Sequence, residues 1–514
     1  MSDRYALAGG QSRPAAPVGR SLVQSDLPAL ATAVAFFDAL NRDGLRYCHW
    51  KSNLRLSWGL CGRTDLDLLV DPHHERRFHA IRNDFPIVAA QAPAGKRYPS
   101  IEDYVGFDPA TGRLFHLHVH YRLVLGEQFV KNYHIPLEDA LLDSAALHLG
   151  VRVPAPEMEL LVLSLRALLK YRDRDALKDV LEIRSPGLPA NIAAEVDWLA
   201  SRTSAERVRA VAERHLPEVA SIVEPFLAAV TDRRDGRRML HLRHQTRRAL
   251  RQHQRGHRPV AVLRYVRESL RRRKRLRFGH SPRRMTVDGG ATIAFVGADG
   301  SGKTTLTHEL DDSLSSLLET RRYYQGSKEP SPLSRGLYVT FRAGRRAHRA
   351  ASGRLGEAHP VARALAAGRD ACLHAHYLSI GLDRYRRHRA GRREAANGAV
   401  VIFDRYPLNA VLDGPQIGVA GGRNGLLARG EEALYRRFSP PDLLVILRVA
   451  PDVALGRKPD HQREAVEAKI HYLDALNDEP ERAPGATIRS VDANRPYPDV
   501  LAAARQAVWD ALSG

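Results

Sequence analysis

The segment GADGSGKTT, residues 297–305, carries the clearest chemistry in the chain. Gly297, Gly302, Lys303 and Thr304 have the spacing of a loop whose backbone N–H groups surround nucleotide phosphates. The lysine of such a loop neutralises the β- and γ-phosphates, and the hydroxyl that follows it is a ligand for Mg²⁺. The strand-like run TIAFV precedes the loop and a helical pattern follows it, as this chemistry requires. The residues predicted to bind the cofactors ATP and Mg²⁺ are Gly297, Asp299, Gly300, Ser301, Gly302, Lys303, Thr304 and Thr305.

Two later patterns place charged groups behind apolar strands. AVVIFDRYP ends in Asp404 and Arg405, so a carboxylate and a guanidinium are expected at the carboxyl edge of a parallel sheet, where ligands bind. APDVALGRKPDHQRE supplies Arg457 and Arg463, two cations that would close over phosphates as a lid. Each pattern alone also fits a surface ion pair, but together with Lys303 and in this order they indicate phosphoryl transfer. Thr304 and Asp404 are the expected Mg²⁺ ligands.

GADGSGKTT, FDRYP and APDVALGRK together resemble the thymidylate kinase family of P-loop nucleoside monophosphate kinases, over about residues 287–514. The resemblance implies a parallel five-stranded sheet, ATP with Mg²⁺, and transfer of the γ-phosphoryl group to a monophosphate. It places Asp299 at the acceptor sugar or its metal-bound water, Asp404 near Mg²⁺ and Arg405 on the acceptor phosphate. Arg384 is a weaker match to a second arginine on the acceptor side.

Two segments depart from that family. The chain reads PLNAVLDGPQIGVAGG where thymidylate kinases carry a Ser-x-x-Ala-Tyr-Gln-like stretch beside the base, and TRRYYQGSKEPSPL differs from the usual acceptor loop. The acceptor therefore stays open between dTMP, another nucleoside monophosphate and a phosphorylated sugar.

A second candidate site lies near the N-terminus. In GRTDLDLLV, Asp65 and Asp67 stand two apart on a predicted strand, so both carboxylates share one face and could hold Mg²⁺ against a triphosphate. With the HWKS turn before it, the segment resembles the nucleotidyltransferase superfamily, which implies a third carboxylate on a later strand. The best candidate strand, LFHLHVHYRL, presents His118 there. The imidazoles of residues 116, 118 and 120 share a face, either as zinc ligands or as ordinary residues of a sheet surface.

Hydrophobic periodicity predicts the elements that position these groups. The expected fold class is multidomain α/β, with a helical region in the middle. The predicted divisions are a flexible tail (1–24), a nucleotidyltransferase-like α/β module (25–150), a helical subdomain (151–230), a basic linker with a helix (231–286) and a thymidylate kinase-like P-loop domain (287–514).

The net charge of +21 is concentrated in one segment, because residues 231–285 hold 20 of the 79 basic residues and three acidic ones. Such a segment attracts polyanions, whether nucleic acid, an anionic membrane surface or a polyphosphorylated substrate. The spacing of Val262, Leu263, Val266 and Leu270 also allows a helix that lies in a membrane interface, and a solvated linker is the remaining interpretation.

Three scattered cysteines without a CxxC pair argue against a disulfide framework. The best apolar run near the N-terminus, Ala29 to Leu40, is shorter than the roughly 20 residues that span a bilayer. These features favour a cytoplasmic protein, with peripheral attachment at the inner membrane surface as one alternative and a homodimer left open. The rival functions are a nucleotidyltransferase with an auxiliary P-loop domain and an ATP-gated module that docks on a membrane or nucleic acid.

Overall fold

The computed structural model describes residues 25–127, 130–171, 188–231, 236–277, 283–326, 328–407, 426–478 and 485–513. The tail predicted for residues 1–24 lies outside them, as does the segment that differs from thymidylate kinases beyond Pro407. None of the described helices is long and apolar enough to cross a membrane.

A six-stranded mixed sheet lies in the N-terminal part, in the order β1-β2-β5-β4-β3-β10. Strands β2 and β5 are parallel neighbours, and the other neighbouring pairs are antiparallel. Helices α1 (Ala31–Arg42) and α3 (Glu75–Asn83) cover one face, where Phe36 and Phe78 pack against Leu68 in a common apolar core. The strands are β1 Tyr47–His49, β2 Leu66–Val70, β3 Ile87–Gln91, β4 Ile101–Asp108, β5 Arg113–His120 and β10 Met285–Thr286.

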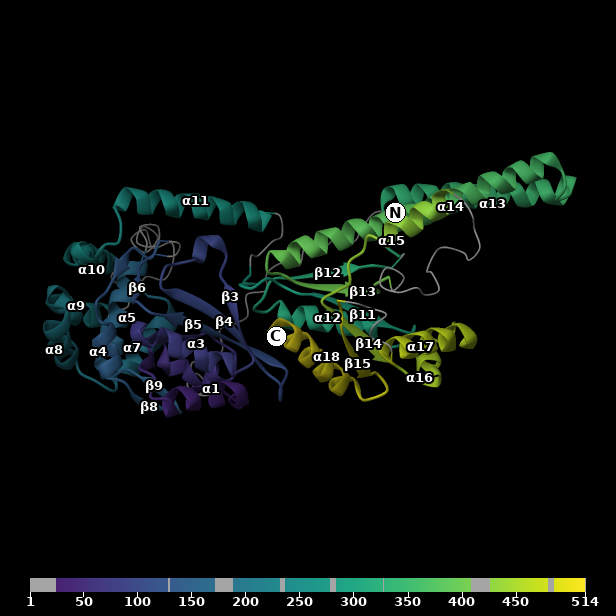
Figure 1. The fold of residues 1–514 in the computed structure, drawn as a ribbon. Coiled ribbons are helices and arrows are strands. Elements are labelled where there is room, and N and C mark those ends of the chain that lie inside the picture. Colours follow the sequence, from purple (N-terminus) through teal and green to yellow (C-terminus); the bar gives the residue numbers. More distant parts are fainter. Residues whose placement is uncertain are drawn as a thin grey trace.

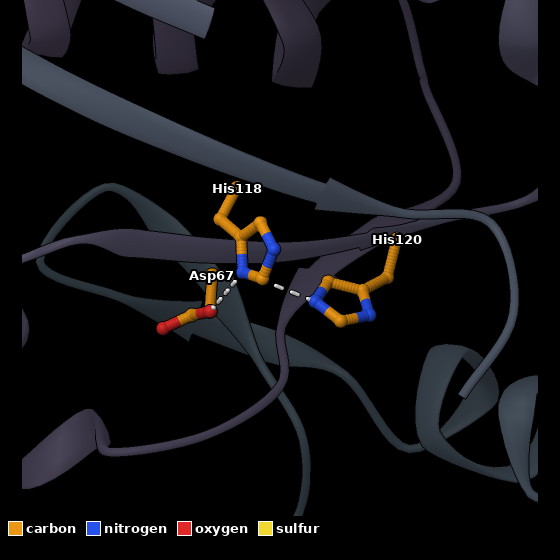
Figure 2. A group of neighbouring side chains, drawn as sticks. All are labelled: Asp67, His118 and His120. Atoms are coloured by element: carbon orange, nitrogen blue, oxygen red, sulfur yellow. Dashed lines mark hydrogen bonds and ion pairs between the residues drawn. The ribbon is translucent and has the colours of Figure 1, made fainter. Parts of the chain in front are cut away.

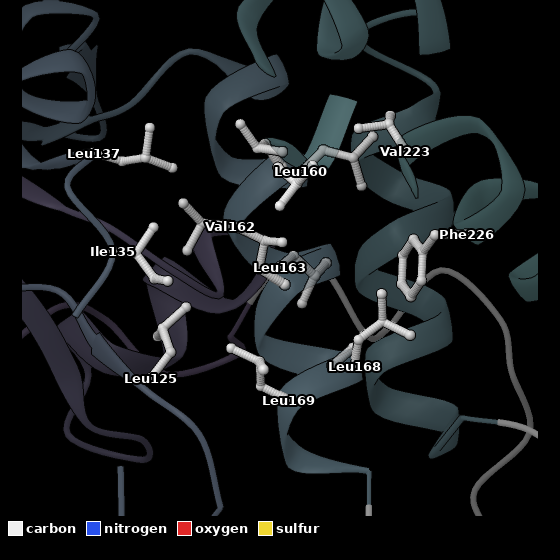
Figure 3. Packing of buried hydrophobic residues seen from close by; sticks show 14 of the residues in the cluster. Leu125, Ile135, Leu137, Leu160, Val162, Leu163, Leu168, Leu169, Val223 and Phe226 are labelled. Atoms are coloured by element: carbon white, nitrogen blue, oxygen red, sulfur yellow. The ribbon is translucent and has the colours of Figure 1, made fainter. Parts of the chain in front are cut away.

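A bundle of helices follows the sheet and has α5 (Pro156–Lys170) at its centre, since this helix is buried on nearly every side. Figure 3 shows Leu160 and Leu168 of α5 packed with Val223 and Phe226 of α9. The other helices here are α4 Glu138–Asp143, α7 Ala190–Ala200, α8 Ala205–His215, α9 Ala220–Thr231 and α10 Gly236–Ala249.

The basic segment 231–286 is not a uniform linker. Met239 and Leu242 of α10 are buried in the bundle core, so the first part of the segment is a packed helix. It continues into α11 (Arg258–Arg277), which runs along the outer edge of the molecule in Figure 1, and it ends in β10 of the N-terminal sheet. The segment predicted as a basic linker with a helix therefore holds two helices, one of them packed in the bundle core, and a strand of the N-terminal sheet.

Short elements complete the N-terminal half. They are α2 Leu56–Leu60, β6 Val124–Leu125, β7 Tyr133–His134, β8 Ala146–His148, β9 Val151–Val153, and the 3₁₀ helices Asn53–Arg55, Pro72–His74, Ala94–Lys96, Pro217–Val219 and Leu250–His253.

The C-terminal part is a five-stranded sheet in the order β12-β13-β11-β14-β15, and all of its strands are parallel. Helices α12 and α18 pack on one face and α14, α15 and α17 on the other, which is the α/β arrangement of P-loop folds. The strands are β11 Thr292–Gly297, β12 Thr320–Tyr324, β13 Val400–Asp404, β14 Leu443–Arg448 and β15 Thr487–Asp492. The helices are α12 Lys303–Leu314, α13 Pro332–Leu355, α14 Pro360–Ala396, α15 Leu426–Tyr435, α16 Pro451–Arg457, α17 Arg463–Asp478 and α18 Tyr497–Ser513.

The long helices α13 and α14 form an antiparallel hairpin that extends away from this sheet in Figure 1. The two sheets share an apolar core, because Val105 and Leu114 of the first pack in one cluster with α12 and α18. Phe107 stacks on Trp509 with ring centroids 5.3 Å apart, and the Trp509 indole donates to the Pro86 carbonyl at 3.1 Å.

Candidate active site

The glycine-rich loop joins the end of β11 to the first turn of α12. Gly300 and Gly302 have φ angles of 91° and 87°, a region that residues with a side chain rarely adopt. A Cβ on Gly300 would lie 2.4 Å from the Ala454 carbonyl oxygen, so no other residue fits there without movement of the backbone. The loop therefore directs the N-terminus of α12, with its unpaired N–H groups, toward the space beside β11.

Lys303 is buried at the first position of α12. Its ammonium donates to the Gly297 and Ala298 carbonyls at 2.9 and 2.7 Å and to the Ser301 hydroxyl at 3.2 Å. Burial lowers the pKa of Lys303 to about 7, and the nearby charge of Lys469 acts in the same direction. A phosphate group would restore the charged form, because an anion stabilises an ammonium.

Thr304 and Asp404 come together at the same edge of the sheet. The parallel register pairs Phe295 with Asp404, and the Thr304 hydroxyl lies 3.2 Å from Asp404 Oδ2. Asp404 is fully buried, and its Oδ1 has no hydrogen-bond partner among the described residues. A carboxylate oxygen left unpaired beside a hydroxyl matches the hard oxygen ligands that Mg²⁺ prefers, so these two residues fit that ion.

Arg405 follows Asp404 in a left-handed conformation with φ 63°, which is uncommon for a residue with a side chain. Its guanidinium donates to Asp299 Oδ1 at 3.3 Å, and Lys469 lies 3.6 Å from the other oxygen of that carboxylate. Burial opposes ionisation of Asp299, but the charges of Lys469, Lys303 and Arg405 outweigh it and lower the pKa. Asp299 therefore stays ionised and holds two cations at the entrance to the loop.

A cavity of about 270 Å³ opens beside the loop. Its described lining holds five cations and one carboxylate, so the cavity suits an anion. The Gln325 side chain is buried, and neither atom of its amide has a partner among the described residues. The lining residues are Val296, Gly297, Asp299, Lys303, Tyr324, Gln325, Gly326, Lys328, Arg384, Arg405, Tyr406, Pro407 and Lys469.

The structure brings some predicted residues to the cavity and leaves others outside. Arg384 of α14 lines it and donates to the Tyr435 hydroxyl at 2.5 Å. Arg457 lies against the loop, where it donates to the Gly300 carbonyl at 3.3 Å. Arg463, predicted as a lid residue, lies on the surface, paired with Asp452 at 2.7 Å. Thr305 is exposed on α12 and is not part of the lining.

The prediction missed Lys328, Gln325 and Lys469. Lys469 lies on α17 within AVEAKIHYL, a run without a motif, and reaches the loop only because α17 packs beside β11 and β14. Gln325 follows β12, an edge strand whose sequence TRRYY is too polar to be recognised as a strand. Its position at the carboxyl end of a strand is the one signal that could have found it.

The second candidate site is one polar face of the N-terminal sheet. Parallel pairing of β2 with β5 places Asp67 opposite His118, and His118 Nδ1 lies 2.9 Å from Asp67 Oδ1. Lys51 Nζ contacts the same oxygen at 2.7 Å. Burial opposes ionisation of Asp67, but the charge of Lys51 and the hydrogen bond to His118 keep its pKa well below the usual value. Asp65 is instead paired with His116, at 2.8 Å.

The prediction looked for a third carboxylate on LFHLHVHYRL. Asp103, on the neighbouring strand β4, lies opposite His118 on this face. It accepts from His116 Nε2 at 2.7 Å and from Arg284 Nε at 3.0 Å. His116 and His120 are buried, so the face is less solvated than expected. Lys131 is close by; burial and the charge of Lys51 lower its pKa to about 7.

No known family profile matches the chain. The uncharacterized ATP-binding protein YghR of Escherichia coli K12 is 31% identical over 232 residues, which cover 42% of this chain and 86% of YghR. YghR of E. coli O6:H1 gives the same figures. The uncharacterized ATP-binding protein YghS of strain K12 is 30% identical over 253 residues, which cover 43% of this chain and 93% of YghS.

Proposed function

The chain belongs to the family of the E. coli proteins YghR and YghS, and we propose that it binds ATP, as their names state of them. The ATP phosphates would lie on the loop from Gly297 to Thr305. The two left-handed glycines, the N-terminus of α12 and the buried ammonium of Lys303 support this placement.

We propose further that residues 287–514 form a thymidylate kinase-like domain that transfers the γ-phosphoryl group of ATP to a monophosphate. The observation that carries this proposal is the cationic cavity that adjoins the loop. The cavity includes Gly297 and Lys303 of the loop and holds four further cations, which is more positive charge than ATP binding alone requires. Arg384 and Arg405 also line the cavity and supply the charges that an acceptor phosphate requires.

Catalysis in this proposal consists of positioning and charge neutralisation. Lys303 leaves the carbonyls that now hold it and binds the phosphates of ATP. Arg405 holds the acceptor phosphate in line, with Asp299 fixing its guanidinium. Thr304 and Asp404 are the residues that would hold Mg²⁺, which when bound neutralises charge on the nucleotide phosphates. Arg457 keeps the loop in shape through the Gly300 carbonyl.

Gln325 favours a nucleoside monophosphate over a phosphorylated sugar as the acceptor. Its amide offers one donor group and one acceptor group, and leaving either buried without a partner costs about 1–3 kcal/mol. The edge of a nucleobase supplies both partners within one rigid plane, as a carboxamide requires. We therefore assign Gln325 to the base of the acceptor.

The test is ADP release from Mg·ATP by the full chain against a panel of nucleoside monophosphates that includes dTMP. One member of the panel is expected to stimulate release, and Lys303→Ala should abolish the stimulation. Lys96→Ala, which removes an exposed lysine from the N-terminal half, is the matched control and should behave as wild type. ATP binding without stimulation by any monophosphate contradicts the kinase proposal.

For residues 25–150 we propose a nucleotidyltransferase-like module, supported by the three carboxylates of residues 65, 67 and 103 on one sheet face. The rival to the kinase proposal is that this module carries the main activity. In that case turnover survives Lys303→Ala and is lost in Asp67→Ala, whereas the kinase proposal expects the opposite pattern.

A second function, docking on an anionic membrane, is favoured by α11. Glu268 is buried on the inner side of this helix, next to Gly95, and Arg271 pairs with it. Leu263 and Leu270 lie on the outer side and are 70% and 58% exposed. Their stripe continues through Pro259, Val262 and Val266 and is flanked by arginines, which is the pattern of a helix in a membrane interface.

Vesicle sedimentation tests this second proposal. The full chain is expected to bind vesicles that contain phosphatidylglycerol more strongly than neutral vesicles. Leu263→Ser should weaken binding several-fold, because it removes an apolar side chain from the exposed stripe that would enter the membrane. Leu147→Ser, on β8, removes a leucine that is 62% exposed and should leave binding unchanged. Binding that needs anionic lipid but ignores Leu263→Ser contradicts insertion of α11.

A further inference from the structure

Three ligand atoms converge on the polar face of the N-terminal sheet, away from the ATP loop. Asp67, His118 and His120 each offer one ligand atom, and the three atoms lie within 4.8 Å of one another. His118 Nδ1 contacts both Asp67 Oδ1 and His120 Nε2. The carboxylate and the His120 ring stand on either side of the His118 imidazole in Figure 2. Asp67 and His120 are buried, and His118 is partly buried.

Backbone pairing fixes this arrangement. Asp67 of β2 is directly opposite His118 of the parallel strand β5, and His120 follows two residues later on the same face. Leu66 and Leu117, the neighbours on the other face, are fully buried in the apolar core. A change of register would expose that core, so the three ligands are held together by the sheet itself.

A single proton serves these three atoms only by being shared between two acceptors. His118 Nδ1 lies 2.9 Å from Asp67 Oδ1 and 3.2 Å from His120 Nε2. If this nitrogen carries a proton, the carboxylate and His120 Nε2 must share it in a three-centre hydrogen bond, which is weaker to each acceptor than a direct one. If it carries none, two lone pairs face each other between His118 and Asp67. A cation between the three atoms satisfies every one of them.

Two of the three separations also fit a transition metal. In a tetrahedral zinc site with bonds of about 2.05 Å, neighbouring ligand atoms lie about 3.3 Å apart. The two short separations here, 2.9 and 3.2 Å, are close to that value. Two imidazoles with one carboxylate are ligands for zinc and its neighbours rather than for Mg²⁺, which prefers oxygen atoms.

We propose that Asp67, His118 and His120 bind a divalent transition metal ion such as Zn²⁺. The three protein ligands leave a fourth position open, which suits a site that also binds a substrate or water. Lys51 shares Asp67 Oδ1 with the metal and therefore competes with it. This site is independent of the proposed kinase reaction.

The test titrates the chelator-treated full chain with Zn²⁺ in the presence of a chromophoric chelator and without nucleotide. Wild type is expected to bind one Zn²⁺, and the double variant His118→Ala/His120→Ala should bind at least tenfold more weakly. The matched control is His134→Ala on β7, where a histidine also contacts a carboxylate, that of Glu138 at 2.8 Å. It should bind as wild type.

Lys51→Met distinguishes a metal site from an ion pair that only stabilises the fold. Removing the competing ammonium should raise the Zn²⁺ affinity several-fold, whereas an ion pair alone predicts no metal binding in either protein. Co²⁺ substitution of wild type gives a measurement that needs no variant. We expect the visible absorption spectrum typical of a Co²⁺ ion with few ligands. Absence of that spectrum, or unchanged Zn²⁺ binding in the double variant, overturns the proposal.

Discussion

Raising the pH from 6 to 8 should weaken ATP binding, and Lys303 should be the cause. In the free protein the pKa of this buried lysine is about 7, well below the ordinary value for lysine. Phosphates bind the charged form, so they raise its pKa in the complex. Above pH 7 the free protein must therefore take up a proton when ATP binds.

The magnitude follows from the pKa. With a value of 7, roughly 90% of Lys303 is charged at pH 6 and roughly 9% at pH 8. The apparent dissociation constant for ATP should then rise about tenfold between these pH values, which corresponds to about 1.4 kcal/mol. At pH 8 about 0.9 proton should be taken up per ATP. Asp299 does not titrate in this window, because its pKa lies below the ordinary carboxylate value.

Calorimetry at pH 8 in two buffers of different ionisation enthalpy measures the uptake directly. The nucleotide phosphates are already deprotonated at this pH, so they contribute little. Lys303→Arg is the control, because a guanidinium stays charged and should remove both the uptake and the pH dependence. A binding enthalpy that is the same in both buffers for wild type, or an uptake that persists in Lys303→Arg, refutes the role given to Lys303.

Three further substitutions test the site and its support. Gly300→Ala should abolish ATP-dependent thermal stabilisation, since its Cβ meets the Ala454 carbonyl at 2.4 Å in a left-handed backbone; stabilisation that persists contradicts the loop assignment. Arg405→Ala should lower acceptor-stimulated ADP release at least 100-fold while ATP still binds in the same thermal assay; an equal loss of ATP binding would place Arg405 on the donor instead. Gly391→Ala should destabilise the chain by about 1–3 kcal/mol in urea unfolding, because its Cβ would lie 2.6 Å from the Phe403 ring; no change in midpoint would mean that α14 can shift there.

The sequence predicted the residues whose positions depend only on the nearby backbone. Gly297 to Thr304 join two adjacent elements, and Asp404 follows the four apolar residues of β13, so local spacing indicated where both lie. Lys469 and Gln325 could not be found in this way. The first depends on how α17 packs, and the second on an edge strand that is only half covered and therefore tolerates arginines and tyrosines.

In the N-terminal site, too, the sequence predicted the arrangement within one strand but not the pairing between strands. Alternation along β5 correctly predicted that three imidazoles share a face, because the period of a strand is two. Alternation within one strand does not say which strand is the neighbour. Asp103 was missed for this reason: β4 pairs with β5 across a turn and brings its carboxylate opposite His118, where the prediction looked for an acid on β5 itself.

The position of Arg284 determines how the two sites must be studied. Its backbone carbonyl accepts from the Glu319 N–H at 2.6 Å, next to the start of β12, while its guanidinium binds Asp103 in the N-terminal face. The adjoining strand β10 completes the N-terminal sheet. A cut at residue 286 would therefore separate Arg284 from the C-terminal sheet and expose the core around Trp509. Because the sheets share this core, an effect on one site after a change in the other reports coupling only when the free energy of unfolding of the full chain is measured alongside.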